Sequence, residues 1–498
     1  MPLYLKADWS FLEKVSMGVG ATRMTMDLLR SQGHCIIELE RYSTSKKIWQ
    51  TKIKRLRVPD LLCLKCGTRF ECRGKSRLQI SMSHSETNSA RSWDYGLRDQ
   101  DIVVFIACEK DLSSGLWKAS PVLNVFYVGD MRQTQGEARL STPKSRDEAA
   151  ERDLEWPSYV PSFSGEIRSI EADSIVLQKS NGQVLRRSLR KATQKLYPSV
   201  VPNSQFIANS KIVAAVVPKS ADVRCIANYG EYDFFTDLCS TNVVNQYVAV
   251  KALRHISELQ DPSIEALVQL EKNHPDPRLR LEASATLANL GHNQAWELIE
   301  NWLNREDEHA LVMEAVLILG EMAYDVRAQG LLMGIAHNTS AHPEIRAAAL
   351  WSMQDYDSLL ERMWPLLGDG DDEVAMHAIV SASRMVNSAN CLSMIEQVGR
   401  DDRLSSGIVR ALLESQKDDW LEVAIDYTIE CGESNVRSWL LYLIGCLGRQ
   451  TVAPILAKHG DKGKEIAEKV VLFWNQFGSD WTCNPPLAEK IRYIRMQI

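Results

Sequence analysis

The sequence of 498 residues lacks several features that would assign it to a class of protein at once. It has no apolar run of the roughly 18 residues that a membrane-spanning helix requires, so we expect no membrane partner. Its first residues carry acids and no apolar core, so we expect no secretory signal. The 11 cysteines are odd in number and have no disulfide-framework spacing, which favours reduced thiols and a cytoplasmic location.

Acidic residues are scarce between residues 41 and 80, although the chain as a whole has a formal net charge of −6. This segment contains twelve Lys or Arg residues and two acids, Asp60 and Glu71. A basic field around two isolated carboxylates suits a site that cleaves phosphodiesters, and it predicts a nucleic acid partner, with DNA expected first. The alternative is a solvated basic face.

The segment over residues 57–83 is predicted to form two strands joined by a tight turn at Lys65-Cys66-Gly67. Strand pairing would bring Asp60 and Glu71 towards each other. Two carboxylates held a few ångströms apart repel each other unless they share a cation, and hard oxygen ligands suit Mg²⁺ or Mn²⁺. The alternative is a charge pattern on a solvated hairpin, which the apolar run after Asp60 disfavours.

The order of motifs around this hairpin resembles the PD-(D/E)xK nuclease superfamily. Pro59-Asp60 is followed on the next strand by Glu71-Cys72-Arg73-Gly74-Lys75. A helix over residues 11–31, which carries Glu13, and a strand over residues 34–40 are predicted before them. The resemblance covers residues 8–108. It implies a restriction-endonuclease-like α/β fold and metal-dependent hydrolysis of phosphodiester bonds.

The resemblance also implies a role for five residues. Asp60 and Glu71 would hold Mg²⁺ or Mn²⁺, which lowers the pKa of a bound water, and Glu13 would position the site or a second ion. The lysine of the family is replaced by Arg73 here, and Lys75 lies two residues further on. Either Lys75 has taken over the role, or Arg73 fills it, or catalysis is weakened or lost. A regular strand would place both cations on the face of Glu71, whereas a bulge at the intervening glycine would turn Lys75 away.

The turn of the hairpin offers a competing interpretation, because Cys63-Leu64-Lys65-Cys66-Gly67 matches one half of a zinc-ribbon knuckle. A closed structural Zn²⁺ site at Cys63 and Cys66 needs two further ligands. The sequence offers Cys35, Cys72, His84 and Cys108. None of them forms a second C-x-x-C or H-x-x-H motif, so packing of these cysteines in an apolar core is the favoured interpretation.

The rest of the chain is predicted to form three further regions. Strands over residues 101–108 and 122–128 complete the first domain at residue 130, and residues 131–160 are expected to be a connector. Short strands with a hairpin turn at Asn181-Gly182 predict a small β-barrel-like domain over residues 161–225.

Residues 226–498 are predicted to form an all-α solenoid that resembles HEAT-type repeats. Ala283, Ala315, Ala348 and Ala378 recur at spacings of 32, 33 and 30 residues. Such a solenoid presents an extended concave surface, so we expect a protein partner there. Acidic runs such as Asp369–Glu373 favour a protein over DNA, although helix capping explains them equally well.

The sequence thus predicts a multidomain α+β protein with a nuclease-like domain, a small β domain and a helical solenoid. The expected function is a metal-dependent nuclease whose solenoid recruits or regulates, an architecture similar to effectors of prokaryotic antiviral defence. The alternative is a catalytically inactive nuclease-like scaffold that binds nucleic acid or a protein. A third interpretation is a zinc-ribbon adaptor.

Overall fold

The computed structural model describes residues 9–39, 49, 56–112, 115–142, 152–191, 194–218, 220–256, 259–305, 308–353, 356–415, 417–471 and 474. The chain forms two compact units. The first, called the sheet unit, comprises Asp8–Lys47, Lys54–His292 and Met496–Ile498. The second, called the solenoid unit, comprises Met1–Ala7, Ile48–Ile53 and Asn293–Arg495.

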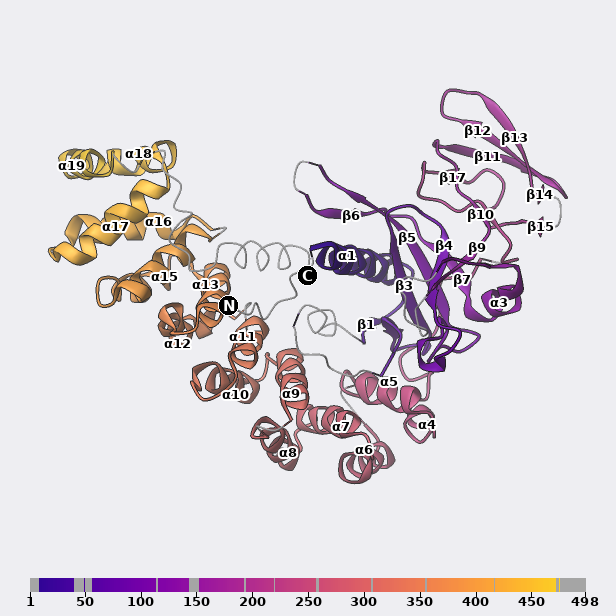
Figure 1. The fold of residues 1–498 in the computed structure, drawn as a ribbon, viewed down its shortest axis with the longest axis horizontal. Helices are drawn as coiled ribbons and strands as arrows, with labels where there is room; N and C mark the ends of the chain where they lie inside the picture. Colours follow the sequence, from indigo (N-terminus) through magenta and orange to yellow (C-terminus); the bar gives the residue numbers. More distant parts are fainter. Residues whose placement is uncertain are drawn as a thin grey trace. The chain divides into compact units, whose positions relative to one another are not determined.

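A six-stranded mixed sheet forms the centre of the sheet unit (Figure 1). Its strands follow the order β1 (Ile36–Glu38), β2 (Leu61–Cys63), β3 (Arg69–Lys75), β5 (Ile102–Lys110) and β6 (Trp117–Ala119), and β7 (Asn124–Tyr127) also pairs with β5. Strand β2 is antiparallel to β1 and β3, whereas β3 runs parallel to β5. Helix α1 (Trp9–Ser31) packs against β3, β5 and β6. The predicted order of helix, strand, hairpin and buried strand is therefore confirmed.

Strand β5 is buried on both faces, as its unbroken apolar sequence predicts. Val103 and Phe105 point into one core, and Ile102, Val104 and Ile106 point into the other. The second of these cores includes residues of α1, which ends just before Gly33. Gly33 has a φ of +91°, the left-handed conformation that commonly terminates a helix.

A second sheet packs into the first of these cores and contains the strands β4 (Ile80–His84), β9 (Arg152–Trp156) and β8 (Arg139–Leu140). Residues 131–160, predicted to be a connector, thus contribute two of its strands. Ile80 is opposite Trp156 in this sheet, and both side chains are buried. The short helices α3 (Val128–Gln133), η1 (Ser89–Arg91) and η2 (Gln135–Glu137) complete this region.

The small β region, predicted to be β-barrel-like, contains three sheets, and its four-stranded sheet is open among the described strands. Its strands follow the order β13-β12-β11-β17, and among the described strands β13 pairs with β12 alone. The side chains of β13 are largely exposed, so no apolar face is available to close the sheet. The predicted hairpin turn at Asn181-Gly182 is confirmed, with Gly182 at a φ of +86°. The strands of this region are β10 (Ser158–Tyr159), β11 (Gly165–Ile170), β12 (Ser174–Lys179), β13 (Val184–Ser188), β14 (Arg190–Lys191), β15 (Gln194–Lys195), β16 (Tyr197–Pro198), β17 (Gln205–Phe206) and β18 (Ala214–Ala215).

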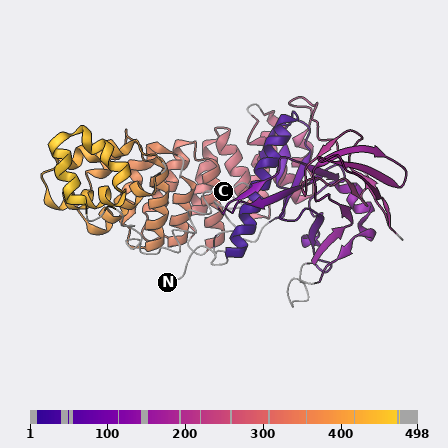
Figure 2. The same cartoon turned by 90° about the horizontal axis from the view of Figure 1, so that it is seen from above.

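From residue 234 onwards the described elements are all helical, as predicted. The sheet unit contains α4 (Phe234–Leu238), α5 (Val243–Leu253), α6 (Asp261–Asn273) and α7 (Pro277–Asn289). In the solenoid unit the helices follow one another in sequence order along the stack (Figure 2). They are α8 (Asn293–Leu303), α9 (His309–Glu321), α10 (Val326–His337), α11 (Pro343–Ser352), η3 (Asp357–Leu359), α12 (Leu360–Met363), η4 (Trp364–Gly368), α13 (Asp372–Met385), α14 (Cys391–Ile395), α15 (Asp402–Leu413), α16 (Trp420–Glu430), α17 (Ser434–Cys446), α18 (Arg449–Lys458) and α19 (Gly460–Val470).

The acidic runs of the solenoid unit cap helices. The side chain of Asp371 accepts hydrogen bonds from the first turn of α13, and Asp401 does the same for α15. Asp369 forms an ion pair with Arg346. These acids therefore stabilise the repeats and are not evidence for a protein-binding surface. Among the described residues, no helix has the length and apolarity needed to cross a bilayer.

Candidate active site

The hairpin of β2 and β3 brings Asp60 and Glu71 to one place. Leu61 is opposite Phe70, so Asp60, which immediately precedes β2, lies opposite Glu71. The Oδ2 atom of Asp60 accepts a hydrogen bond of 2.7 Å from the backbone N–H of Cys72. The guanidinium of Arg73 contacts both acids: Nη1 lies 3.7 Å from Asp60 Oδ2, and Nη2 donates a hydrogen bond to Glu71 Oε1. Two carboxylates therefore share one cation.

Strand β3 is regular, so the arrangement that places both cations on the face of Glu71 is the one observed. Its register with β5 runs without a break from Phe70 to Lys75. Gly74 faces α1, where a Cβ atom would lie 3.0 Å from the backbone oxygen of Met17. The glycine is thus required for close helix packing and does not mark a bulge.

Lys75 lies on the predicted face, and its ammonium group is hydrogen-bonded to Ser81. Its Nζ atom donates to the backbone oxygen of Ser81 at 2.7 Å and to Ser81 Oγ at 2.8 Å. The same Nζ lies 6.0 Å from the centre of the Phe105 ring. Of the two cations that could replace the family's lysine, Arg73 is seen to bridge the carboxylates.

Glu13 is not brought to the carboxylates. Its Oε1 atom accepts a hydrogen bond of 2.5 Å from Lys110, the last residue of β5. Val103 is the β5 partner of Glu71, so Lys110 is seven strand positions further along, or roughly 23 Å. The structure thus separates Glu13 from Asp60 and Glu71.

The two carboxylates stabilise the positive charge of Arg73. Burial disfavours the charged guanidinium, but the carboxylates of Glu71 and Asp60 outweigh this effect and raise the pKa of Arg73. One cation against two anions leaves a formal charge of −1 on the three side chains. The Arg73 and Asp60 side chains keep 26% and 21% of their exposure, so a ligand can reach them from solvent.

Two carboxylates with solvent access fit the modest protein ligand set that Mg²⁺ requires, because this ion keeps several waters. The Arg73 guanidinium lies against both carboxylates, so metal binding there requires it to move. Within the described part of the chain, no third His, Cys or acid forms a metal-binding cluster with them.

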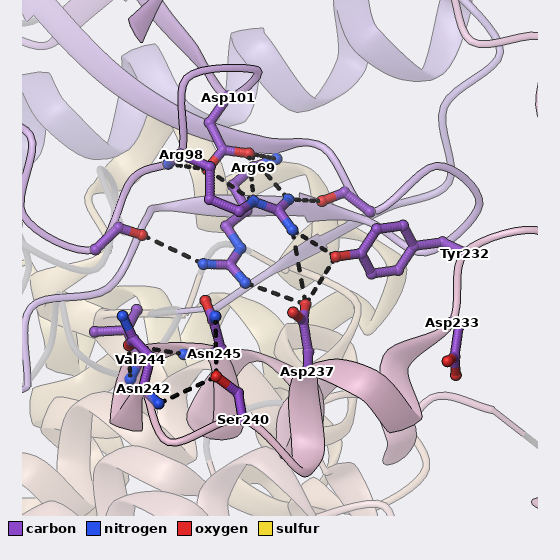
Figure 3. Close-up of polar contacts among 12 residues, drawn as sticks. Arg69, Arg98, Asp101, Tyr232, Asp233, Asp237, Ser240, Asn242, Val244 and Asn245 are labelled. Atoms are coloured by element: carbon purple, nitrogen blue, oxygen red, sulfur yellow. Dashed lines mark hydrogen bonds and ion pairs between the residues drawn. The ribbon is translucent and has the colours of Figure 1, made fainter. Parts of the chain in front are cut away.

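Of the cations in the predicted basic field that the structure describes, Arg69 is not available to a ligand. Six of the field's twelve cations lie outside the described residues: Arg41, Lys46, Lys47, Lys52, Lys54 and Arg55. Arg69 is fully buried and donates to Asp237 Oδ2 at 3.2 Å (Figure 3). Burial, together with the nearby charge of Arg98, lowers the pKa of Arg69. Its charge stabilises the fold and is not available to a phosphate.

The network around Arg69 joins β3 to helix α4 (Figure 3). The hydroxyl of Tyr232 donates to Asp237 Oδ2 at 2.8 Å, and Arg98 donates to Asp101 Oδ1 at 3.0 Å. Asp101 also accepts from the backbone N–H of Arg69 at 3.2 Å. The acids and the guanidinium groups of this network are therefore paired with one another.

The sheet unit also contains a cavity of about 1180 Å³ that does not include the carboxylates. It lies beyond the end of β3, and its lining includes Arg77, Lys110, Lys118, Arg139, Glu155 and Trp156. Three of these four cations, Lys110, Lys118 and Arg139, thus lie outside the basic segment over residues 41–80.

The zinc ligands proposed from sequence are corrected in part. Cys72 and Cys108 belong to the core that packs against α1, and the Nδ1 atom of His84 lies 3.4 Å from the backbone nitrogen of Trp93. The residues that approach Cys63 and Cys66 are instead His34 and Cys225. No local motif pointed to Cys225, because it lies 162 residues after Cys63.

The comparisons with known proteins concern the helical part of the chain. Residues 264–354 match the family model of HEAT repeats, which confirms the predicted repeat type. No curated protein is significantly similar to the chain. Among solved structures, the complex of CpcE and CpcF of phycocyanin lyase from Nostoc is 16% identical with a TM-score of 0.22, covering 56% of this chain and 100% of that one. Human deoxyhypusine hydroxylase is 14% identical with a TM-score of 0.20, covering 48% of this chain and 94% of that one.

Proposed function

We propose that the sheet unit is a metal-dependent nuclease domain with a restriction-endonuclease-like fold. The observation that carries this proposal is the convergence of Asp60, Glu71 and Arg73 on one face of the β2–β3 hairpin. The order of α1, β1, β2 and β3 follows the order of motifs that suggested the superfamily. The metal would be Mg²⁺ or Mn²⁺, held by Asp60 and Glu71, and the expected substrate is DNA.

Each residue has a defined task in this proposal. The bound cation lowers the pKa of a coordinated water and offsets charge on the scissile phosphate. Asp60 is held in place by the Cys72 N–H, so one of its oxygens is oriented before any ligand arrives. To admit a cation, Arg73 would move off the carboxylates, and its planar N–H pair would then bind the phosphate. The permanently charged guanidinium would not serve as the general base.

The second proposed function is an inactive nuclease-like scaffold, and the same guanidinium favours it. Arg73 contacts both carboxylates in the structure, which removes much of their attraction for a cation. A domain of this kind would bind nucleic acid or protein without cleaving it. In both proposals the HEAT solenoid recruits a protein partner, and an effector role in antiviral defence would suit the nuclease.

The two proposals are separated by assaying cleavage and binding on the same preparation of the full chain. Plasmid DNA and single-stranded RNA are incubated with Mg²⁺, Mn²⁺ or EDTA, and binding is followed by fluorescence anisotropy. For the nuclease, cleavage requires metal and is abolished by Asp60→Asn and by Glu71→Gln. The control Asp173→Asn alters an exposed acid of the small β region and retains wild-type cleavage.

Three outcomes decide between the proposals. Cleavage that survives both carboxylate substitutions contradicts the nuclease. Binding that needs no metal and is never followed by cleavage supports the scaffold. Absence of both binding and cleavage with DNA and RNA contradicts a nucleic acid function for this domain.

A further inference from the structure

Four side chains meet at the turn of the hairpin, at the opposite end from the carboxylates. Ligand atoms of His34, Cys63, Cys66 and Cys225 all lie within 4.8 Å of one another. His34 and Cys63 are buried, and Cys66 and Cys225 are half-buried. We propose that these four residues bind one structural Zn²⁺ through three thiolates and one imidazole.

The spacing of the four atoms suits a tetrahedral zinc. Cys63 Sγ lies 4.0 Å from Cys225 Sγ, and Cys66 Sγ lies 3.8 Å from His34 Nδ1. With Zn–S bonds of about 2.3 Å and Zn–N bonds of about 2.0 Å, tetrahedral ligands are separated by roughly 3.5–3.8 Å. In these two pairs the ligand atoms need to move by a few tenths of an ångström, and every other pair lies within 4.8 Å. A disulfide would instead need a sulfur–sulfur distance of about 2.05 Å.

The histidine is oriented for this role by a hydrogen bond on its other nitrogen. His34 Nε2 lies 2.8 Å from the backbone oxygen of Val223. A carbonyl oxygen can only accept, so Nε2 carries the proton and Nδ1 presents its lone pair to the cluster. Metal-binding histidines usually donate their remaining N–H to such a partner, which fixes both tautomer and ring orientation.

The backbone around the cluster is also adapted to it. The N–H of Gly67 donates to the backbone oxygen of Cys63 at 2.9 Å, which closes the turn that carries the two knuckle cysteines. Gly67 has a φ of +66°, and a Cβ atom there would lie 2.3 Å from the ring of Tyr232. At Gly33, a Cβ atom would lie 2.6 Å from the backbone oxygen of Cys225. Only glycine permits these approaches at both positions.

The segment that supplies Cys225 has no regular structure, since residues 220–233 contain no helix or strand. The N–H of Cys225 donates to the backbone oxygen of Gln32 at 3.0 Å. Tyr232, near the other end, bonds Asp237 in the buried network (Figure 3). A zinc ion would join this segment to the hairpin turn and to the end of α1.

A second cluster of possible metal ligands, His309, His342 and Glu344, forms hydrogen bonds without an ion. In the solenoid unit, His342 Nδ1 accepts the N–H of Glu344 at 3.2 Å and so caps α11. His309 Nε2 lies 3.3 Å from Glu344 Oε2, within hydrogen-bond distance. These residues therefore provide a control for the zinc proposal.

The test measures metal in the full chain, so its result does not depend on nuclease activity. Protein is purified under reducing conditions without chelator, and its metal content is measured by inductively coupled plasma mass spectrometry. We expect about one zinc per chain in the wild type, as for a closed structural site. Cys66→Ser and Cys225→Ser should lose it, whereas Cys239→Ser, at an exposed cysteine, and His309→Asn should retain it.

A second measurement guards against variants that fail to fold. Cobalt-substituted wild-type protein should show the visible bands of tetrahedral Co²⁺ and the charge-transfer bands of thiolate ligands. His34→Cys should retain the metal and strengthen the charge-transfer bands, because it adds a fourth thiolate. Zinc-free wild-type protein, a Cys63–Cys225 disulfide detected by mass spectrometry, or zinc that is lost in His309→Asn but kept in Cys66→Ser overturns the proposal.

Discussion

The two ends of the β2–β3 hairpin present opposite kinds of ligand. At the open end, Arg73 of β3 contacts the hard oxygens of Asp60 and Glu71 and compensates part of their charge. At the turn, the soft ligand atoms of Cys63 and Cys66 face His34 and Cys225. In the proposals above, the first end would bind a metal only transiently, whereas the second would hold a resident ion.

Removing metal should affect the two ends very differently, and this is the largest effect that we expect. Extraction of zinc with a strong chelator should lower the free energy of unfolding by about 4 kcal/mol or more, as loss of a structural metal does. Withdrawal of Mg²⁺ should leave it unchanged, because Arg73 already compensates the carboxylates. Urea unfolding of matched samples measures both quantities. Equal sensitivity to the two treatments would contradict the distinction between a resident and a transient ion.

The buried network behind the turn is predicted to be the next most sensitive feature. Asp237→Ala leaves Arg69 buried without its partner and should cost about 3–5 kcal/mol of folding free energy. The matched change Asp233→Ala removes only the side chain that caps α4 and should cost about 1 kcal/mol. Thermal unfolding followed by circular dichroism compares the two. Similar losses would show that the Arg69 ion pair does not stabilise the turn end.

At the open end, the two cations of β3 should not be equivalent. Arg73→Ala should lower the cleavage rate by a factor of about 10² if its guanidinium stabilises charge in the transition state. Lys75→Ala should change the rate by less than about tenfold, since Lys75 is bonded to Ser81. Arg73→Lys restores the cation type of the superfamily and serves as the conservative control. Single-turnover cleavage measures all three, and a larger loss for Lys75→Ala would reverse the assignment.

Local sequence signals predicted most of the structure around these ends. The apolar run of β5 predicted a buried strand, and the glycine after α1 predicted the end of that helix. The alternation of side chains along β3 placed Glu71 and Arg73 on one face. HEAT repeats were recognisable because the same helix pair recurs. The division of the β-barrel-like region into separate sheets was not predicted, because short strands such as β10 and β18 pair across long stretches of the sequence.

Partners from distant parts of the chain could not be predicted. Cys63 and Cys66 showed half of a metal site, but Cys225 reaches them through a segment without regular structure. Arg69 was counted in a basic field because its sequence neighbours are basic, whereas its acidic partner Asp237 lies 168 residues away. A charged side chain or a thiol in the sequence thus suggests that an interacting residue exists. Only the three-dimensional fold shows which residue it is.

The smallest effect is expected at Glu13, which the superfamily resemblance placed in the active site. Its partner in the structure is Lys110, and both side chains are more than one-third exposed. Such a pair contributes about 0.2–1 kcal/mol, so Glu13→Gln should reduce stability only slightly and leave cleavage within about twofold of wild type. The reciprocal variant Lys110→Gln should match it in stability. A loss of cleavage in Glu13→Gln comparable to that in Glu71→Gln, with wild-type stability, would instead show that α1 reaches the carboxylates during the reaction.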